Sequence, residues 1–459
     1  MAVTADYLHS FIDEQPDQGI YRVHRSMFTD EDLFELEMRH IFEGGWVFMA
    51  HESQLPDPFD FITGHIGRQP VIINRDKAGG LQGFINACQH RGAQIERMSR
   101  GNRKLFTCPF HGWCYRANGE LASCGDSDNT RYTEQFDKQA LGLPRIPQVA
   151  DYRGFIFASL NADVPPLDQH LGQAARCIDH IVDQHPEGKL EVLPGKQFYT
   201  FEGNWKLQAE NGVDGYHVGT IHANYVQTIA NRKKIRAEQD GVKPMDVGSL
   251  GGELPNGFYA FENGHVMLWN EWTNPQARSA YPLLPELTER YGPTIAKWMT
   301  GYMRNMLIYP NVFLMDQMSS QIRMFRPLSV NRTQVTSMCF APVDEDPAMR
   351  THRIRQFEDF FNASGMATPD DLAAFNASQA GFEARQVEWN DLSRGAASQV
   401  EGPDALAREL GLRPLYCGTN LEDEGIYLNQ HRRWLEMLEA GLERDAHQAA
   451  AAGGQRHVA

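Results

Sequence analysis

The chain has 459 residues, of which 42% are hydrophobic and 22% charged, an ordinary composition for a soluble globular protein of two or three domains. Its formal net charge of -16 argues against a nucleic-acid-binding protein, which needs clustered excess lysine and arginine. The longest apolar runs have the length of buried strands, which argues against a membrane protein, and no signal-peptide pattern is visible at the start.

Residues 1–42 are predicted to form a helical segment that packs with the domain formed by residues 166–459. Thr29 is the expected N-cap of its main helix, with an acid three residues later in the capping-box position. Hydrophobic residues, among them Leu33 and Leu36, then follow at helical spacing.

Residues 43–165 are predicted to form a compact all-β domain. Short runs rich in β-branched and aromatic residues follow one another here: WVFMA, FITGHI, PVIINR, GFINAC and KLFTC. Asn118-Gly119, between CYRA and ELAS, is a strong signal for a hairpin turn.

Residues 166–459 mix helices with longer strands, so the predicted fold class of the whole chain is α+β. The strands QIRMFRPLSV and QVTSMCFAPV flank a predicted hairpin at Asn331-Arg332. A helix is predicted to begin at 368–371, where a proline at the first position and two acids favour a helix N-terminus, and to end at Gly395.

Two short Cys–His motifs in the all-β domain indicate a metal site. Cys88-x-His90 is followed, after seventeen residues, by Cys108-x-x-His111. Two thiolates on one iron and two imidazoles on the other make the Rieske form of a [2Fe–2S] cluster, in which neutral imidazoles raise the reduction potential. The seven cysteines of the chain are an odd number, which suits free thiols in a reducing cytoplasm better than a disulfide framework.

A structural Cys₂His₂ zinc site is the competing interpretation of this motif. Zinc fingers usually pair cysteine with cysteine and histidine with histidine along the chain. Here each loop carries one residue of each type, which favours the Rieske cluster.

A second group of metal-ligand residues is Asp214-x-x-His217-x₄-His222. Two histidines and a distant carboxylate would form the facial triad of a non-heme Fe(II) oxygenase. Residues five apart on a straight helix lie about 140° apart around its axis, so the helix must end or distort between the histidines, as Gly219 permits. Asp214, on the same helical face as His217, is expected to hold the other ring nitrogen of that histidine.

The spacing alone favours two ordinary structural histidines, and only the Rieske motif in the same chain reverses this preference. The carboxylate ligand is left open by the sequence pattern. Glu383, Glu388 and Asp391, near the end of the helix predicted from 368, are the candidates, although most acids are solvated surface residues.

The chain resembles the large (α) subunits of Rieske-type aromatic-ring-hydroxylating dioxygenases, in the group that acts on benzoate, toluate and anthranilate. The likeness rests on NACQHRGAQ and FTCPFHGW around the cluster motif, and on GNWKLQAENGVDGYHV, YPNVFLMDQ, RQFEDFFNASGMATPDDL and EDEGIYLNQH. It implies a Rieske domain at 43–165 and a catalytic mononuclear-iron domain at 166–459. The latter is expected to have a START-like helix-grip fold, with an antiparallel sheet surrounded by helices.

The resemblance also implies roles for individual residues. The cluster ligands are then Cys88, His90, Cys108 and His111, and the iron ligands are His217, His222 and Asp391, the aspartate of WND. Asp214 matches the aspartate that connects His217 to a cluster histidine, here His111, of the neighbouring subunit. Asn211 matches an asparagine near the iron.

The implied partners are a small β subunit in an α₃β₃ assembly, a head-to-tail trimer of α subunits, and a reductase with FAD and a [2Fe–2S] cluster that delivers electrons from NADH. With O₂ as co-substrate, the implied reaction is cis-dihydroxylation of an aromatic carboxylate, such as benzoate or toluate, at the 1,2 positions. Alternatives are an anthranilate or halobenzoate 1,2-dioxygenase that forms catechol, and a Rieske monooxygenase or demethylase. A carboxylate substrate needs a cationic or hydrogen-bonding partner, for which Arg232 and Arg323 are candidates.

Overall fold

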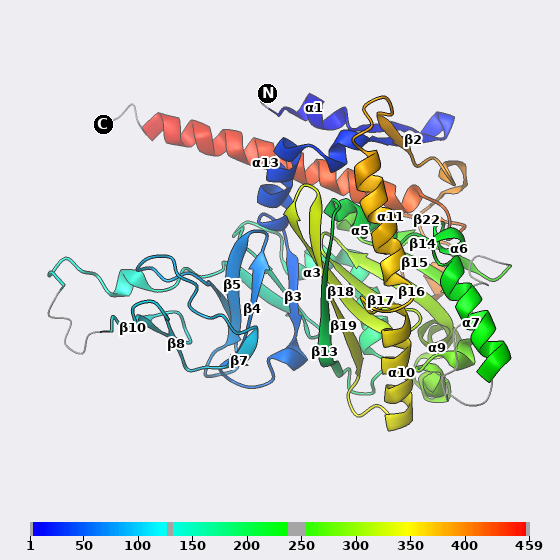
Figure 1. Cartoon of the computed structure of the whole chain (residues 1–459), viewed down its shortest axis with the longest axis horizontal. Helices are drawn as coiled ribbons and strands as arrows, with labels where there is room; N and C mark the ends of the chain where they lie inside the picture. Colours follow the sequence, from blue (N-terminus) through cyan, green and yellow to red (C-terminus); the bar gives the residue numbers. More distant parts are fainter. Residues whose placement is uncertain (1–2, 126–131, 237–252, 456–459) are drawn as a thin grey trace. The chain divides into compact units, whose positions relative to one another are not determined.

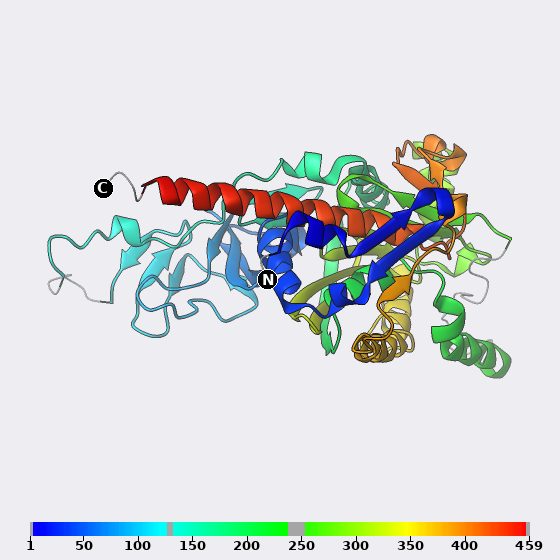
Figure 2. The same ribbon diagram turned by 90° about the horizontal axis from the view of Figure 1, so that it is seen from above.

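The computed structural model describes residues 3–125, 132–236 and 253–455 of the chain (Figure 1 and Figure 2). It divides into two compact units. One is Phe42–Leu167, and the other combines Met1–Ile41 with Asp168–Ala459. Within the described ranges, no helix has both the length and the apolarity needed to cross a membrane.

The unit Phe42–Leu167 is built from three small antiparallel sheets, which confirms the predicted all-β arrangement. Their strand orders are β6-β5-β4-β7, β10-β9-β8 and β11-β12-β3. The strands are β3 (Val47–His51), β4 (Asp60–Ile66), β5 (Gln69–Arg75), β6 (Leu81–Ile85), β7 (Arg100–Asn102), β8 (Leu105–Thr107), β9 (Cys114–Arg116), β10 (Leu121–Ser123), β11 (Gln148–Tyr152) and β12 (Phe155–Ser159). The predicted hairpin at Asn118-Gly119 joins β9 to β10, with Gly119 at a φ of +87° that glycine adopts most easily.

The other unit is organised around a nine-stranded antiparallel sheet of order β13-β19-β18-β17-β16-β15-β14-β22-β21 (Figure 1). Its strands are β13 (Leu190–Phe201), β14 (Asn256–Ala260), β15 (Val266–Glu271), β16 (Tyr302–Ile308), β17 (Val312–Asp316), β18 (Ser320–Ser329), β19 (Arg332–Pro342), β21 (Val400–Glu401) and β22 (Tyr416–Gly418). Ser329 pairs with Arg332, which confirms the hairpin predicted there. A separate small sheet has the order β1-β2-β20, formed by β1 (Ile12–Gln15), β2 (Ile20–His24) and β20 (Trp389–Asp391).

Most of the helices belong to this larger unit, where they alternate with strands along the chain. The described α-helices are α1 (Ala5–His9), α2 (Glu31–Leu36), α3 (Leu167–Leu171), α4 (Ala175–Val182), α5 (Trp205–Asn211), α6 (Val218–Ile221), α7 (Ala223–Arg236), α8 (Leu284–Tyr291), α9 (Pro293–Gly301), α10 (Pro347–Phe360), α11 (Thr368–Gly381), α12 (Ala405–Glu409) and α13 (Gly425–Gln455). A π-helical turn at Glu37–Phe42 follows α2 directly.

Two predicted helix boundaries are wrong. The N-cap of α2 is Asp30, whose Oδ1 accepts the Leu33 N–H at 2.9 Å, because Thr29 still closes the preceding turn through its own N–H to Ser26. The helix that begins at Thr368 ends at Gly381 and not at Gly395. The chain beyond it is drawn into β20, whose backbone pairs with β2, so tertiary pairing overrides the local helical pattern.

A buried carboxylate, Glu37, fixes the start of α5. It is fully buried and accepts hydrogen bonds from the Nε1 atoms of Trp205 and Trp434, both at 2.7 Å, and from Nζ of Lys206 at 2.5 Å. Trp434 belongs to α13, which runs beside α1 in Figure 2. Because Trp205 and Lys206 open α5, these bonds hold the helix that leads into the His217 segment.

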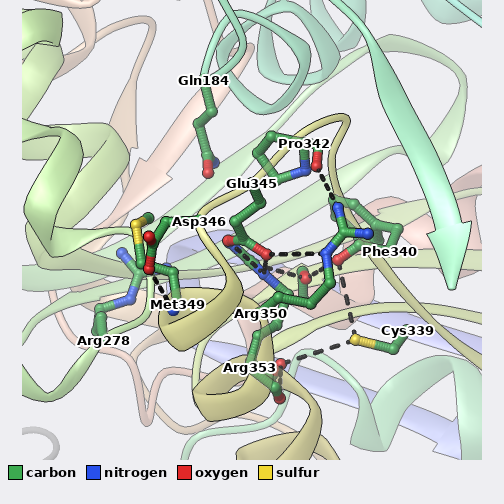
Figure 3. A network of polar contacts seen from close by, with 12 residues as sticks. Gln184, Arg278, Cys339, Phe340, Pro342, Glu345, Asp346, Met349, Arg350 and Arg353 are labelled. Carbon is green, nitrogen blue, oxygen red and sulfur yellow. Dashed lines mark hydrogen bonds and ion pairs between the residues drawn. The ribbon is translucent and has the colours of Figure 1, made fainter.

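Buried ion pairs connect residues of the nine-stranded sheet and of α10 with their neighbours. Arg353 on α10 pairs with Glu345, its Nε lying 2.9 Å from Oε1 (Figure 3). Arg278 and Arg304 both pair with Asp316 at the end of β17. Each buried guanidinium here has a carboxylate partner, as the desolvation of an ion requires.

His265 is expected to make this unit sensitive to acid. Its ring is fully buried; Nδ1 accepts the Tyr309 N–H at 3.0 Å, and Nε2 lies 2.8 Å from the His170 carbonyl oxygen, so both ring nitrogens suit the neutral form. Burial lowers the pKa of His265 to about 4. The unfolded chain binds this proton near pH 6.5, so stability falls as the pH decreases from about 6.5 to about 4, by about 2 kcal/mol at pH 5.

The measurement is the melting temperature of the wild type and of His265→Gln at pH 7 and pH 5. The variant is expected to be less stable at pH 7 but to lose less on acidification. Equal losses in the two proteins would contradict the assignment.

Candidate functional site

The two Cys–His loops of the unit Phe42–Leu167 have the same backbone hydrogen bonds. In the first loop, the Cys88 N–H donates to the Ala93 carbonyl at 2.9 Å, and the Gly92 N–H donates to the Cys88 carbonyl at 2.8 Å. In the second, the Cys108 N–H donates to Trp113 at 2.7 Å, and the Gly112 N–H donates to Cys108 at 3.0 Å. Both glycines have a φ of +72°, a left-handed conformation that a tight turn requires here.

In both loops the cysteine is buried and the histidine is exposed. Cys88 and Cys108 are 3% and 2% exposed, whereas His90 and His111 are exposed. The two imidazole rings lie side by side, with their centroids 4.6 Å apart. Two buried sulfur donors and two exposed nitrogen donors fit a cluster whose one iron is held by thiolates and whose other iron is held by histidines.

Tyr115 is a residue of this site that lies outside the Cys–His motifs. Its hydroxyl lies 3.3 Å from Cys88 Sγ and accepts the Gln89 N–H at 3.1 Å. The ring is fully buried on β9, in the hydrophobic core that contains both cysteines. A hydrogen bond from a hydroxyl to a ligating sulfur raises the potential of an iron–sulfur cluster. In the sequence, Tyr115 could have been noticed as an aromatic residue four positions after His111, at the end of the second loop.

His217 and His222 lie at the two ends of α6, a helix of four residues. The segment between α5 and α6 is a turn, not part of a straight helix, and the chain leaves α6 at His222 itself rather than at Gly219. The two Nε2 atoms therefore approach to 3.2 Å in spite of the five-residue spacing. His222 is 4% exposed, so its ring faces the interior.

Asp371, in the first turn of α11, completes a possible metal site with the two histidines. Its Oδ1 lies 3.5 Å from His217 Nε2 and 3.4 Å from His222 Nε2. One donor atom from each residue lies within 4.8 Å of the others. Two imidazole nitrogens and a carboxylate oxygen are the donor set of a facial triad, so these residues fit a mononuclear iron.

The structure does not place Asp391, the predicted third ligand, beside the two histidines. Asp391 is exposed on β20, where it lies opposite Arg22 of β2 and its Oδ1 accepts the Ser393 N–H at 2.9 Å. Glu383 and Glu388 are also exposed. From the sequence, Asp371 is interpreted only as an acid that favours the N-terminus of a helix, but its spacing also indicates a buried position. Asp371 shares the buried face of α11 with Phe375 and Gln379, and a carboxylate on such a face needs a partner.

Asp214 lies beside the second ring nitrogen of His217, as predicted. It does so from a turn, whereas the prediction placed it on the same face of a helix. Its Oδ2 lies 3.2 Å from His217 Nδ1, and its Oδ1 accepts the Tyr216 N–H at 2.7 Å. Burial opposes the charge of Asp214, but the hydrogen bonds from His217 and the backbone hold the pKa of this carboxyl below its usual value. Asn211 Nδ2 lies 3.4 Å from both His217 Nε2 and Asp371 Oδ1, which places this residue beside the three possible ligands.

His217, His222 and Asp371 line one cavity. The apolar part of its wall is formed by Leu268, Met303, Met315, Phe360 and Phe361. Arg323 lines the cavity too, whereas Arg232 is an exposed residue of α7 that pairs with Asp359 at 2.9 Å. The arrangement can bind an apolar ring next to a metal ion.

Two family models match the parts of the chain that contain the two sites. Residues 189–409 match the model of the ring hydroxylating alpha subunit (catalytic domain), and residues 45–136 match the Rieske [2Fe-2S] domain. The fold is similar to that of naphthalene 1,2-dioxygenase from Rhodococcus sp., with a TM-score of 0.79 and 23% identity over 91% of this chain and 94% of that one. This likeness supports the fold alone.

Three curated proteins are similar over nearly their whole length. The 2-halobenzoate 1,2-dioxygenase large subunit of Burkholderia cepacia is 48% identical over 94% of this chain and 92% of its own length. Toluate 1,2-dioxygenase subunit alpha of Pseudomonas putida is 47% identical over 97% of each chain. The anthranilate 1,2-dioxygenase large subunit of Acinetobacter baylyi is 44% identical over 97% of this chain and 95% of its own.

Proposed function

Since the chain belongs to the family of ring-hydroxylating dioxygenase α subunits, we propose that it cis-dihydroxylates an aromatic carboxylate such as benzoate or toluate at the 1,2 positions. The family is that of enzymes with a Rieske [2Fe–2S] domain and a non-heme iron domain, which use O₂. The observation that carries the proposal is the group His217, His222 and Asp371, which lines a cavity together with apolar side chains.

The proposed ligands of the [2Fe–2S] cluster are Cys88, His90, Cys108 and His111. When bound, the cluster supplies electrons one at a time. The protein contributes the two matching loops, the burial of both thiols and the Tyr115 hydroxyl beside Cys88 Sγ. A match to the Rieske domain over 45–136 argues against the zinc interpretation.

The proposed ligands of the mononuclear iron are His217, His222 and Asp371. An iron held on one face by three protein ligands supplies the oxygen chemistry that no side chain can perform. Asp214 Oδ2 lies 3.2 Å from His217 Nδ1, which favours the tautomer with the proton on Nδ1 and leaves Nε2 free to bind a metal. Asn211 helps to orient Asp371, because its amide Nδ2 lies 3.4 Å from Asp371 Oδ1.

The relatives named for 2-halobenzoate and anthranilate support a second candidate. In it, the same addition of two oxygen atoms is followed by loss of carbon dioxide and of halide or ammonia, which leaves catechol. A monooxygenase or demethylase is a weaker candidate, because the relative named as an N-demethylase is 33% identical over 62% of this chain.

A substrate panel with labelled dioxygen tests the proposal. Benzoate, the toluates, anthranilate and 2-halobenzoates are each incubated with the protein, a matched reductase and ¹⁸O₂. The expected result is a cis-diol carboxylate with two labelled oxygen atoms from benzoate or a toluate. Catechol formed only from anthranilate or a halobenzoate would favour the second candidate, and one labelled atom would contradict a dioxygenase.

The proposed assembly is a head-to-tail trimer of α subunits, with a small β subunit in an α₃β₃ complex. The relatives are named as large or alpha subunits, which supports a smaller partner. A reductase with FAD and a [2Fe–2S] cluster would deliver the electrons from NADH. None of the seven cysteines forms a disulfide, which suits the cytoplasm as the compartment in which these partners meet.

A further inference from the structure

We infer that Arg323 binds the carboxylate of the substrate and thereby selects aromatic acids over uncharged rings. This inference rests on the proposed function, since it names the partner of the carboxylate in the same cavity. Arg323 belongs to β18 and lines the cavity that begins at His217, His222 and Asp371.

The register of the sheet places Arg323 on the face that carries the cavity. Leu268, Asn305 and Met315 are opposite one another on β15, β16 and β17, and all three line the cavity. Met315 pairs with Gln321, and Arg323 lies two residues further along β18, on the same face. The arginine therefore reaches the cavity from the sheet, whereas the three possible metal ligands come from α6 and α11.

Arg323 differs from the other buried arginines in having no carboxylate partner. Four arginines in the described ranges are at most 4% exposed: Arg278, Arg304, Arg323 and Arg353. Three of them form ion pairs with Asp316 or Glu345. No ion pair of Arg323 occurs among the described residues, and its buried Nε lacks a hydrogen-bond partner there.

A buried guanidinium without a counter-ion is unfavourable, and the fold compensates this charge at the other three positions. The remaining open side of Arg323 is the cavity, so an anion in the cavity would complete the same arrangement. Phe361, which also lines the cavity, has its ring centroid 5.8 Å from the guanidinium carbon. An apolar ring with one carboxylate matches these walls, and a guanidinium binds a carboxylate with two parallel hydrogen bonds.

The test compares the binding of benzoate and benzamide to the oxidised, cluster-containing enzyme by isothermal titration calorimetry, in the wild type, Arg323→Gln and Arg323→Lys. The wild type is expected to bind benzoate on the order of 10²-fold more tightly than benzamide. Arg323→Gln is expected to abolish this preference, and Arg323→Lys to keep part of it. In turnover, Arg323→Gln is expected to raise KM for benzoate with little change in kcat, because an interaction of the bound substrate is lost.

Arg232→Gln is the matched control, since Arg232 is exposed and paired with Asp359; unchanged binding is expected. Visible spectra of the cluster and melting curves show whether each variant is folded. Equal affinity of the wild type for benzoate and benzamide would overturn the inference even if Arg323→Gln did not fold. An Arg323→Gln variant that binds benzoate as tightly as the wild type would also overturn the inference. The proposed function would not be affected by that result. A wild type that binds no aromatic carboxylate would instead overturn the proposed function.

Discussion

Replacement of Asp371 by alanine is expected to remove the mononuclear iron and abolish turnover, while the Rieske cluster stays in place. The carboxylate lies within 3.5 Å of both histidine Nε2 atoms and is buried, as is His222. Two neutral imidazoles without the anionic ligand bind Fe(II) much more weakly. We expect turnover to fall on the order of 10³-fold or more. Iron content should drop by about one third while acid-labile sulfide stays constant, because the cluster accounts for the other two irons.

Asp391→Ala is the matched control for this experiment. Asp391 is exposed and bonded locally to the Ser393 N–H, so iron content and turnover should remain at the wild-type level. Stability should change by at most about 1 kcal/mol. The opposite pattern, with iron retained in Asp371→Ala and lost in Asp391→Ala, would show that Asp391 is the ligand after all.

Asp214→Ala is expected to lower turnover at least about 10²-fold with both metal centres still present. Asp214 is a positioning residue, because it acts on the metal through His217 and, in the proposed trimer, connects that histidine to His111 of the neighbouring subunit. The loss of the carboxylate 3.2 Å from Nδ1 frees the His217 ring and removes the proposed link between the centres. The measurement is the rate of cluster reoxidation by O₂ and substrate in a single turnover, with iron content and the electron resonance signal of the cluster as controls.

Mixed assemblies test whether this link joins two chains. Cys108→Ser removes a cluster ligand but keeps Asp214, and Asp214→Ala keeps the cluster. Each variant alone is expected to be nearly inactive. Co-expression should restore up to roughly one quarter of the wild-type turnover, since random head-to-tail assembly places an intact cluster before an intact Asp214 at that share of interfaces. Mixed assemblies that form but stay inactive would contradict electron transfer between chains.

The resemblance to ring-hydroxylating dioxygenase α subunits is confirmed by the family matches and by relatives 44–48% identical. The hairpins at Asn118-Gly119 and Asn331-Arg332 and the start of α11 are also where the sequence predicts them. These features depend on a few neighbouring residues, so local sequence is sufficient to predict them. The same holds for the cluster motif, because each loop carries its sulfur and its nitrogen donor within four residues.

The third metal ligand and the arginine in the cavity required the tertiary structure. The spacing of Asp371 to Phe375 and Gln379 indicates that it lies on the buried face of α11. It does not indicate which distant residues Asp371 meets there, and only the packing of α11 beside α6 brings it to His217 and His222. Likewise, the sequence does not distinguish the two candidate arginines. The register of the sheet buries Arg323 beside the cavity, whereas Arg232 is exposed on α7. The sequence by itself determined which donor types are present and how they pair over short spacings. Which distant side chains share one volume was decided by long-range packing, because no local pattern encodes the distance between segments far apart in the chain.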